Sequence, residues 1–311
     1  REVVSELSKI KGEPDWMADK RIKSLEIFER KPVPTWGPDL SGLNLDDLVL
    51  YSPPTAGRFN SWDDVPADMK QTYEDLGIPQ AEREHLAGVV GVWRQEPVYE
   101  GLKEEYAKQG ILFCSMDTAI TEYPELVQKY FMTKCVPAQD NKFSALHGAV
   151  WSGGAFCYIP KGVKCDLPLQ SYFRMEGAGE GTFEHTLIIA DEGAEVNYIE
   201  GCTAQTYSVN SMHSAVVEIF VHEGAKARYT TVQNWSKDVY NLNTKRAIVD
   251  ANGTVEWVGG SMGAKYVMLY PGSFLMGEGA RADHLNVGVA GKGVHKDTGA
   301  KVVHLAPNTT S

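Results

Sequence analysis

Several features that define common protein classes are missing from this sequence. It contains no G-x-x-x-x-G-K-[ST] motif, so the chain is not itself a P-loop ATPase. It has no apolar run long enough to span a bilayer, and its opening residues, Arg1 and Glu2, begin a stretch of mixed charges rather than a signal peptide. Positive charge is scarce, with 30 Lys and Arg against 41 Asp and Glu and a net charge of −11. This balance argues against a broad nucleic-acid surface.

Cysteines are few and none lies in a Cys-x-x-Cys pair. An odd number without close pairs favours a reducing cytosol over a disulfide framework, so we expect a cytoplasmic protein. It also excludes a zinc ribbon or a ferredoxin-type cage formed by one stretch. Since the chain does not begin with Met, we expect a processed or incomplete sequence. The five cysteines are Cys114, Cys135, Cys157, Cys165 and Cys202.

A length of 311 residues with 43% hydrophobic content predicts two domains with a sizeable core. Residues 1–134 have mostly helical spacing of apolar residues, and residues 31–60 form an arm rich in Pro and Gly. Helices are predicted to follow Pro14, Pro66 and Pro79, to lie between Pro97 and Gly110, and to begin at Thr121.

Residues 135–311 have a different pattern, in which short β-branched and aromatic runs alternate with turns and no helix is expected. The turns repeat at nearly constant spacing, which is typical of stacked coils. We therefore predict an α+β protein with a helical first domain (1–134) and a parallel β-helix as second domain (135–311). A stacked β-sandwich is the alternative. The turn glycines are Gly162, Gly193, Gly224, Gly253 and Gly279.

Two motifs resemble enzyme signatures but lack their structural context. Residues 259–263 match the G-x-S-x-G nucleophile elbow, yet a strand rather than a helix is expected after Ser261. Residues 277–282 match a dinucleotide fingerprint, again without a following helix. A β-solenoid hydrolase that uses Ser261 or a Cys–His pair is therefore the second functional hypothesis.

Histidines are scattered through the β region. His185 and His213 are 28 residues apart, close to one coil, so they could stack and share a metal. Solvent-facing or satisfied core histidines are the simpler interpretation. Cys157 and Cys165 flank a turn that carries lysines, but this spacing is not diagnostic of any site.

The strongest functional candidate is Cys202, at the end of a predicted strand. Gly201 removes side-chain bulk beside it, so that another group can approach closely, and Glu200 is a polar neighbour. An inert buried cysteine is the alternative. Arg174 precedes Cys202 by 28 residues, about one coil, so we expect it to stack beside the thiol and favour the thiolate.

A second polar stretch lies one coil further on. Strand alternation places Gln233 and Trp235 on the same face. Lys245 follows in the sequence and is expected at the next edge of the coil. If that face points inward, these side chains form a polar lane inside the solenoid. Buried polar groups need partners or a ligand, so the lane predicts a functional interior.

Several long motifs resemble the SufB/SufD family of iron–sulfur cluster assembly proteins, and SufB in particular. The similarity extends through essentially the whole chain. The stretches that carry it are residues 13–17, 75–79, 140–146, 149–154, 168–174, 198–204, 212–218, 233–235 and 297–301.

The resemblance implies a right-handed parallel β-helix and a scaffold role without ATPase activity of its own. Cys202 would receive sulfur as a persulfide or bind the nascent cluster, and Arg174, Gln233, Trp235 and Lys245 would line the sulfur route. The implied partners are the ATPase SufC, SufD or a second SufB, a cysteine desulfurase of the SufS type with a SufE- or SufU-type donor, and apo iron–sulfur proteins. Reduced flavin is linked to some complexes of the family, although no flavin site is visible in this sequence. Family members usually continue beyond Ser311.

Overall fold

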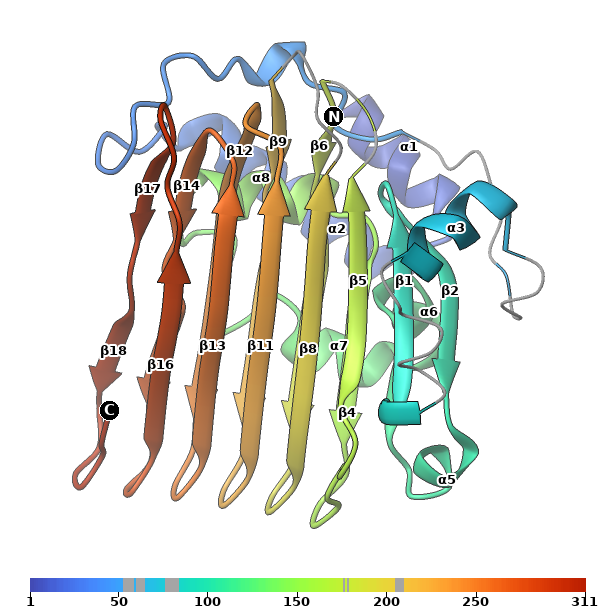
Figure 1. Ribbon diagram of the computed structural model, residues 1–311, viewed down its shortest axis with the longest axis vertical. Coiled ribbons are helices and arrows are strands. Elements are labelled where there is room, and N and C mark those ends of the chain that lie inside the picture. Colours follow the sequence, from blue (N-terminus) through green and yellow to red (C-terminus); the bar gives the residue numbers. More distant parts are fainter. Residues whose placement is uncertain (53–58, 60–64, 76–83, 176, 178, 205–209) are drawn as a thin grey trace.

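The computed structural model describes residues 1–52, 59, 65–75, 84–175, 177, 179–204 and 210–311. Its strands stack in parallel into a β-solenoid, and most of its helices lie on one side of the solenoid (Figure 1). The helices are α1 (Glu2–Ile10), α2 (Asp15–Arg30), α3 (Ala67–Asp75), α5 (Glu104–Ala107), α6 (Met116–Glu122), α7 (Pro124–Tyr130) and α8 (Lys142–Val150), with a 3-10 helix η1 at Leu45–Asp47.

Two long sheets form the walls of the solenoid. The front sheet of Figure 1 has the order β16 (Arg281–Gly288), β13 (Thr254–Gly263), β11 (Lys226–Trp235), β8 (Glu195–Ala204), β5 (Leu169–Met175), β1 (Gly88–Trp93) and β2 (Glu96–Leu102). The back sheet has the order β17 (His295–Thr298), β14 (Tyr266–Leu269), β12 (Val239–Val249), β10 (Val216–Val221), β7 (His185–Ala190), β4 (Gly154–Ile159) and β3 (Leu112–Ser115), with β15 (Gly272–Leu275), β18 (Lys301–His304), β6 (Gly181–Thr182) and β9 (Ser211–His213) attached.

The parallel solenoid expected from the repeat is confirmed, and its turns stack on one another. The amide of Gly162 donates to the carbonyl of Glu192, and the amide of Gly193 donates to that of Glu223, at 2.8 and 2.9 Å. The prediction for the fourth corner is wrong by one residue. At this corner the residue with the left-handed backbone conformation is Asn252, with φ of 56°, and not Gly253. Asn tolerates this conformation because its short side chain can hydrogen-bond locally.

The prediction that no helix occurs after residue 135 is also wrong, because α8 packs against the back sheet. The side chain of Asn141 caps it by accepting hydrogen bonds from the amides of Phe143 and Ser144. Every residue from Phe143 to Val150 is buried, so the helix has no polar face. A helix without an amphipathic pattern gives little periodic signal in the sequence.

The first 134 residues are less helical than predicted. The helices expected after Pro14 and Pro66 are present as α2 and α3, and α6 and α7 occupy the region near Thr121. The helix expected between Pro97 and Gly110 is present only as the short α5, because β2 takes the first part of this stretch by pairing with β1. The helix expected after Pro79 begins outside the described residues. The boundary at 134/135 stays a prediction.

A helical layer of α1, α2 and α8 covers the outer face of the back sheet, where one apolar cluster joins residues of the helices and the strands. A second apolar cluster fills the space between the two sheets. No helix among the described residues is both long and apolar enough to cross a membrane.

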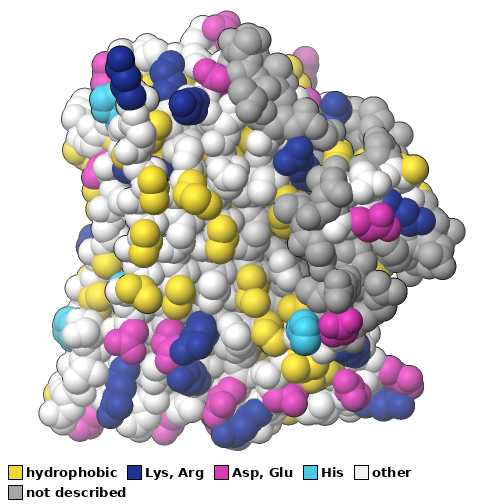
Figure 2. Space-filling view, viewed as in Figure 1, with side chains coloured by type: hydrophobic (Ala, Val, Ile, Leu, Met, Phe, Trp, Pro, Cys, Tyr) yellow, Lys and Arg dark blue, Asp and Glu magenta, His cyan; other side chains and the backbone are white. Residues whose placement is uncertain are grey.

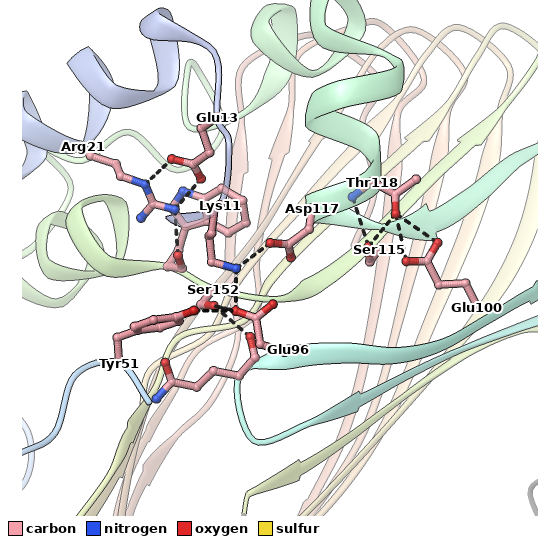
Figure 3. Close-up of polar contacts among 12 residues, drawn as sticks. Lys11, Glu13, Arg21, Tyr51, Glu96, Glu100, Ser115, Asp117, Thr118 and Ser152 are labelled. Atoms are coloured by element: carbon pink, nitrogen blue, oxygen red, sulfur yellow. Dashed lines mark hydrogen bonds and ion pairs between the residues drawn. The ribbon is translucent and has the colours of Figure 1, made fainter. Parts of the chain in front are cut away.

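A buried charged cluster ties the helical layer to the solenoid (Figure 3). Lys11 Nζ lies 2.8 Å from Glu96 Oε1 and 2.5 Å from Asp117 Oδ1. The hydroxyl groups of Tyr51 and Ser152 also donate to Glu96 Oε1, at 3.2 and 3.1 Å. These contacts join the end of α1 and the arm to the start of β2 and to α6, so the cluster fixes the layer in place.

The outer face of the front sheet is different. Apolar side chains gather there over β11, β13 and β16 (Figure 2), and they include Val232, Met262, Leu285 and Val287. Below them in the figure lies a band of alternating Lys, Arg, Asp and Glu.

Candidate functional site

The interior of the solenoid carries a row of polar side chains among apolar ones. Along β8, strand alternation points Val196, Tyr198, Glu200 and Cys202 inward, and all four are buried. The register of β11 on β8 places Gln233 beside Cys202. The predicted interior lane is therefore present, and Cys202 and Gln233 lie at neighbouring positions in it.

Lys245 reaches into the interior from the back sheet and meets Glu200. Its Nζ lies 3.1 Å from Glu200 Oε1 and 2.6 Å from the hydroxyl oxygen of Tyr229. Tyr229 also donates to Glu200 Oε1. The side chains of Lys245 and Glu200 are 0% and 2% exposed, so this is a fully buried ion pair.

The environment of Glu200 favours its ionised form. Burial alone would raise its pKa, but the charge of Lys245 and the hydrogen bonds from Tyr229 and Lys245 outweigh burial, and the pKa is lowered. Thr186 donates to the second oxygen, Oε2, at 3.2 Å. Glu200 is therefore a carboxylate whose two oxygens both accept hydrogen bonds.

Cys202 is 1% exposed, and its Sγ lies 3.7 Å from Glu200 Oε1. Burial raises the pKa of its thiol well above the ordinary value, and the negative charge of Glu200 raises it further. Lys245 acts in the opposite direction but does not reverse the shift. The resting side chain is a neutral thiol that donates to Glu200, not the thiolate expected from the sequence.

The structure explains why the thiolate expectation fails. The register of β5 on β8 pairs Phe173 with Cys202 and pairs Arg174 with Thr203. Arg174 therefore points to the opposite face from Cys202, where its Nη1 donates to Thr203 Oγ1 at 3.0 Å. Tyr172 shares that face, and a Cβ added at Gly201 would lie 2.9 Å from its ring. The missing side chain of Gly201 thus lets the ring of Tyr172 lie close to the backbone of β8, as predicted from the sequence.

Gln233 and Trp235 follow Cys202 across the lane. Gln233 Oε1 accepts from Trp235 Nε1 at 3.3 Å and from Asn241 Nδ2 at 2.8 Å. The other amide atom of Gln233, Nε2, is buried without a hydrogen-bond partner among the described residues. A fully buried donor left in this state is unfavourable unless something else satisfies it.

His213 closes the far side of the lane. Its ring packs against Trp235 with 4.3 Å between the ring centroids. Its Nδ1 lies 2.8 Å from Asn241 Oδ1, and its Nε2 lies 2.9 Å from Glu184 Oε2. The sequence offered no signal for Glu184, whereas Asn241 opens the polar stretch that contains Lys245. Tyr229 was recoverable, because strand alternation places it on the face of Gln233.

The histidine ladder considered from the sequence does not form. The register places Val216 beside His185 and Asn241 beside His213, so the two histidines are not stacked. Among the described residues, no group of three or more His, Cys, Asp or Glu side chains is arranged to hold a metal ion.

The hydrolase hypothesis finds no support. Ser261 lies inside β13, and β14 rather than a helix follows it. Its Oγ accepts from Lys296 Nζ at 3.0 Å, while Cys202 hydrogen-bonds to Glu200 rather than to a histidine. Neither residue has the surroundings of an activated nucleophile in a hydrolase.

Comparisons with known proteins agree with the fold. Residues 173–311 match the model of the SUF system FeS cluster assembly, SufBD core domain, and residues 64–171 match that of the SufBD protein N-terminal region. Iron–sulfur cluster assembly SufBD family proteins of Staphylococcus haemolyticus and Staphylococcus epidermidis are each 53% identical to this chain over 309 residues. The alignment covers 99% of this chain and 66% of each relative. This chain belongs to the SufBD family of iron–sulfur cluster assembly proteins.

Proposed function

We propose that this chain acts as the SufB-type scaffold on which sulfur and iron are combined into a nascent cluster. Cys202 accepts sulfur as a persulfide inside the solenoid, and the cluster later passes to apo iron–sulfur proteins. The proposal rests on the family membership together with the polar lane around Cys202.

The observation that carries this assignment is the unpartnered amide of Gln233. Its Nε2 is a buried donor without a partner among the described residues, and Gln233 lies next to Cys202 in the register. A sulfur atom added to Cys202 would be an anionic acceptor where such a donor is available. The lane is thus complementary to the persulfide rather than to the free thiol.

Sulfur transfer to Cys202 would proceed by thiol–persulfide exchange. The raised pKa of the Cys202 thiol and the lowered pKa of Glu200 oppose a proton transfer between them at rest, so the proton passes from Sγ to Glu200 Oε1 only when the donor persulfide lies beside the thiol. The thiolate then attacks the outer sulfur of the donor persulfide, a new S–S bond forms, and the donor's S–S bond breaks. The released donor thiolate takes up a proton, so that atoms and electrons balance.

The remaining lane residues would guide and shield the sulfur. Lys245 compensates the charge of Glu200 when Cys202 is a neutral thiol, and it stabilises the negative persulfide afterwards. Trp235 and its stack with His213 exclude water from one side. Arg174, on the outer face, would act where sulfur enters rather than at the thiol itself.

The proposed partners are those of the SUF system. SufC supplies ATP hydrolysis, SufD or a second SufB pairs with this subunit, and a SufS-type desulfurase with a SufE- or SufU-type protein delivers sulfur. Cys202 is the iron ligand that we propose in this chain, and a partner subunit would complete the ligand set. A cytoplasmic location and a contribution of reduced flavin stay predictions, and no step above depends on either.

The test is cluster assembly in the complete complex. Wild type, Cys202→Ser and the control Cys157→Ser are each purified with SufC and SufD, supplied anaerobically with iron, cysteine and the desulfurase, and examined by Mössbauer and UV–visible spectroscopy. We expect wild type and Cys157→Ser to assemble a cluster and Cys202→Ser to assemble none. Undiminished assembly by Cys202→Ser would disprove the role of this cysteine.

A further inference from the structure

A second buried polar chain lies on the other side of the back sheet, away from the lane. It links α8, β7 and β10 through three side chains that are each 0% exposed, namely His147, His185 and Glu218. His147 Nε2 lies 3.0 Å from His185 Nδ1, and His185 Nε2 lies 3.1 Å from Glu218 Oε2. At the other end, His147 Nδ1 lies 3.0 Å from the carbonyl oxygen of Ser214.

The three contacts among Ser214, His147, His185 and Glu218 need three hydrogens. Both ends, the carbonyl of Ser214 and the carboxyl group of Glu218, are acceptors unless Glu218 is protonated. Two neutral imidazoles carry two N–H groups, whereas the chain has three contacts. All three can be hydrogen bonds only if one further proton is present.

The direction of each bond then follows. A carbonyl cannot donate, so His147 Nδ1–H donates to Ser214 and His147 Nε2 accepts from His185 Nδ1–H. If both imidazoles are neutral, His185 Nε2 is left as an acceptor, and Glu218 supplies the third proton as a carboxylic acid. The third proton on His185 instead would create a buried imidazolium–carboxylate pair. Without that proton, one of the three contacts places two lone pairs against each other.

We propose that the His147–His185–Glu218 chain binds one structural proton, carried on Glu218, and that the protonated carboxyl group joins the two histidines to residues 131–136 on the outer face of the back sheet. Glu218 Oε2 accepts from the amide of Met132 at 2.7 Å, and Oε1 accepts from the amide of Val136 at 2.8 Å. The carboxyl group therefore holds the segment between α7 and α8 as well as the histidines.

The surroundings favour the neutral form of all three groups. Burial raises the pKa of Glu218 to about 7, although its two backbone hydrogen bonds act in the opposite direction. Burial lowers the pKa of His185 and of His147 well below the ordinary value. The ring of Phe131 covers His185 with 4.0 Å between the ring centroids. An ionised pair would lack solvation here.

Charged and titratable groups from neighbouring elements do not replace the proton. None of them donates a hydrogen bond to Glu218 or to either histidine among the described residues. Lys20 of α2 donates to the carbonyls of Phe131 and Met132 instead. Arg21 of α2 forms an ion pair with Glu13, and Arg246 of β12 forms one with Asp140. The remaining groups nearby are Cys135 and His213 of β9.

The proton also has a consequence for the lane. Ser214, which accepts from His147, directly follows His213, whose ring packs on Trp235 inside the solenoid. Without the proton, Glu218 can accept from His185 only if both imidazoles move their hydrogen to Nε2, and the contact between His147 Nδ1 and the carbonyl of Ser214 then lacks a hydrogen. The proton site is thus a support for the wall of the lane, although it stands independently of the sulfur chemistry proposed there.

The test is infrared spectroscopy of the purified protein, in the complex if the isolated chain does not remain soluble. We expect the C=O stretch of a buried, protonated carboxylic acid at pH 6, absent from Glu218→Gln and unchanged in the control Glu192→Gln, which is an exposed glutamate. The free energy of unfolding of wild type relative to Glu218→Gln should fall as pH rises from 4.5 towards about 7. An identical spectrum and pH profile for wild type and Glu218→Gln would overturn the proposal.

Nitrogen-15 NMR of the histidines in the wild type gives a test that needs no variant. We expect His147 and His185 both to carry the proton on Nδ1, with Nε2 unprotonated. A wild-type protein in which either Nε2 carries the proton at pH 6 would contradict the proposal. This result holds even if Glu218→Gln does not fold.

Discussion

Two buried ion pairs in this molecule serve different purposes. In the helical layer, Arg21 donates to both carboxylate oxygens of Glu13 and to the carbonyl oxygens of Ala149 and Trp151, at 2.6 to 3.1 Å. Its guanidinium group has a partner on every nitrogen, and Figure 3 shows the contact with Glu13. The guanidinium carbon Cζ lies 4.7 Å from the centroid of the Trp151 ring. This pair joins elements and leaves no group open.

The pair of Glu200 and Lys245 is surrounded differently. It lies between two sheets that the apolar core already holds together. Beside it are a thiol and the unpartnered Nε2 of Gln233. The comparison teaches that a saturated buried pair supports the architecture, whereas a buried pair with an open donor and a nucleophile beside it is suited to chemistry.

Breaking the saturated pair should have the largest effect on stability. Arg21→Met leaves Glu13 buried without its partner, which costs about 3–5 kcal/mol. Chemical denaturation measures the change. The exposed pair of Lys161 and Glu192 provides the control, since Lys161→Met should leave the stability nearly unchanged. An equally small change for Arg21→Met would show that the layer does not depend on this pair.

Lys245→Ala should destabilise the chain by about 3 kcal/mol, because it leaves Glu200 as an unpaired buried charge. It should also slow the arrival of sulfur while Cys202 remains as the acceptor. The double variant Glu200→Gln with Lys245→Ala should recover most of the stability, since no buried charge remains. If the double variant is no more stable than Lys245→Ala, the two residues do not act as a pair.

The pH dependence of stability should separate Glu200 from Glu218. The pKa of Glu200 is lowered by folding, so its contribution is present above the unfolded value of 4.5 and is lost as pH falls through the folded value. The pKa of Glu218 is raised to about 7, so its contribution is present below 4.5 and is lost as pH rises towards 7. Unfolding of Glu200→Gln and Glu218→Gln at several pH values should therefore differ from wild type with opposite slopes.

Glu200→Gln should make the thiol of Cys202 more reactive. The negative charge of Glu200 is the second cause of the raised pKa, after burial, so its removal should lower that pKa. Alkylation by a small thiol reagent at fixed pH should become several-fold faster, while Cys157, buried in the same core, provides the control within the same sample. An unchanged ratio of the two rates would show that burial alone sets the reactivity of Cys202.

Cys202→Ser should have the smallest effect on folding among the buried changes, about 1–3 kcal/mol. The serine hydroxyl group can donate to Glu200 as the thiol does. Circular dichroism and denaturation should therefore show a folded protein, which makes the loss of cluster assembly interpretable. Failure of this variant to fold would identify Cys202 as a structural cysteine.

The repeat of turn glycines was sufficient to predict the solenoid, because all five corners have a residue with a left-handed backbone and glycine, which adopts it easily, takes that position at four of them. The fully buried α8 and the strand β2 were not predictable in this way. Their conformations depend on packing against the sheets rather than on a periodic pattern of their own.

The candidate site was predictable in part. Strand alternation placed Gln233 and Trp235 on one face and predicted a polar lane. It could not place Arg174, because the 28-residue separation from Cys202 differs by one residue from the true register, and one residue reverses the face. The raised pKa of the thiol depends on burial and on Glu200, which strand alternation places on the same face as Cys202.

The most direct test of the central claim is to map sulfur on the cysteines of the wild-type chain by mass spectrometry. The complex is treated with the desulfurase, its sulfur-transfer partner and cysteine in the absence of iron, and each cysteine peptide is analysed for a bound sulfane sulfur. We expect the sulfur on Cys202 and not on Cys135 or Cys157. Sulfur on those cysteines, with Cys202 left as a free thiol, would contradict the account.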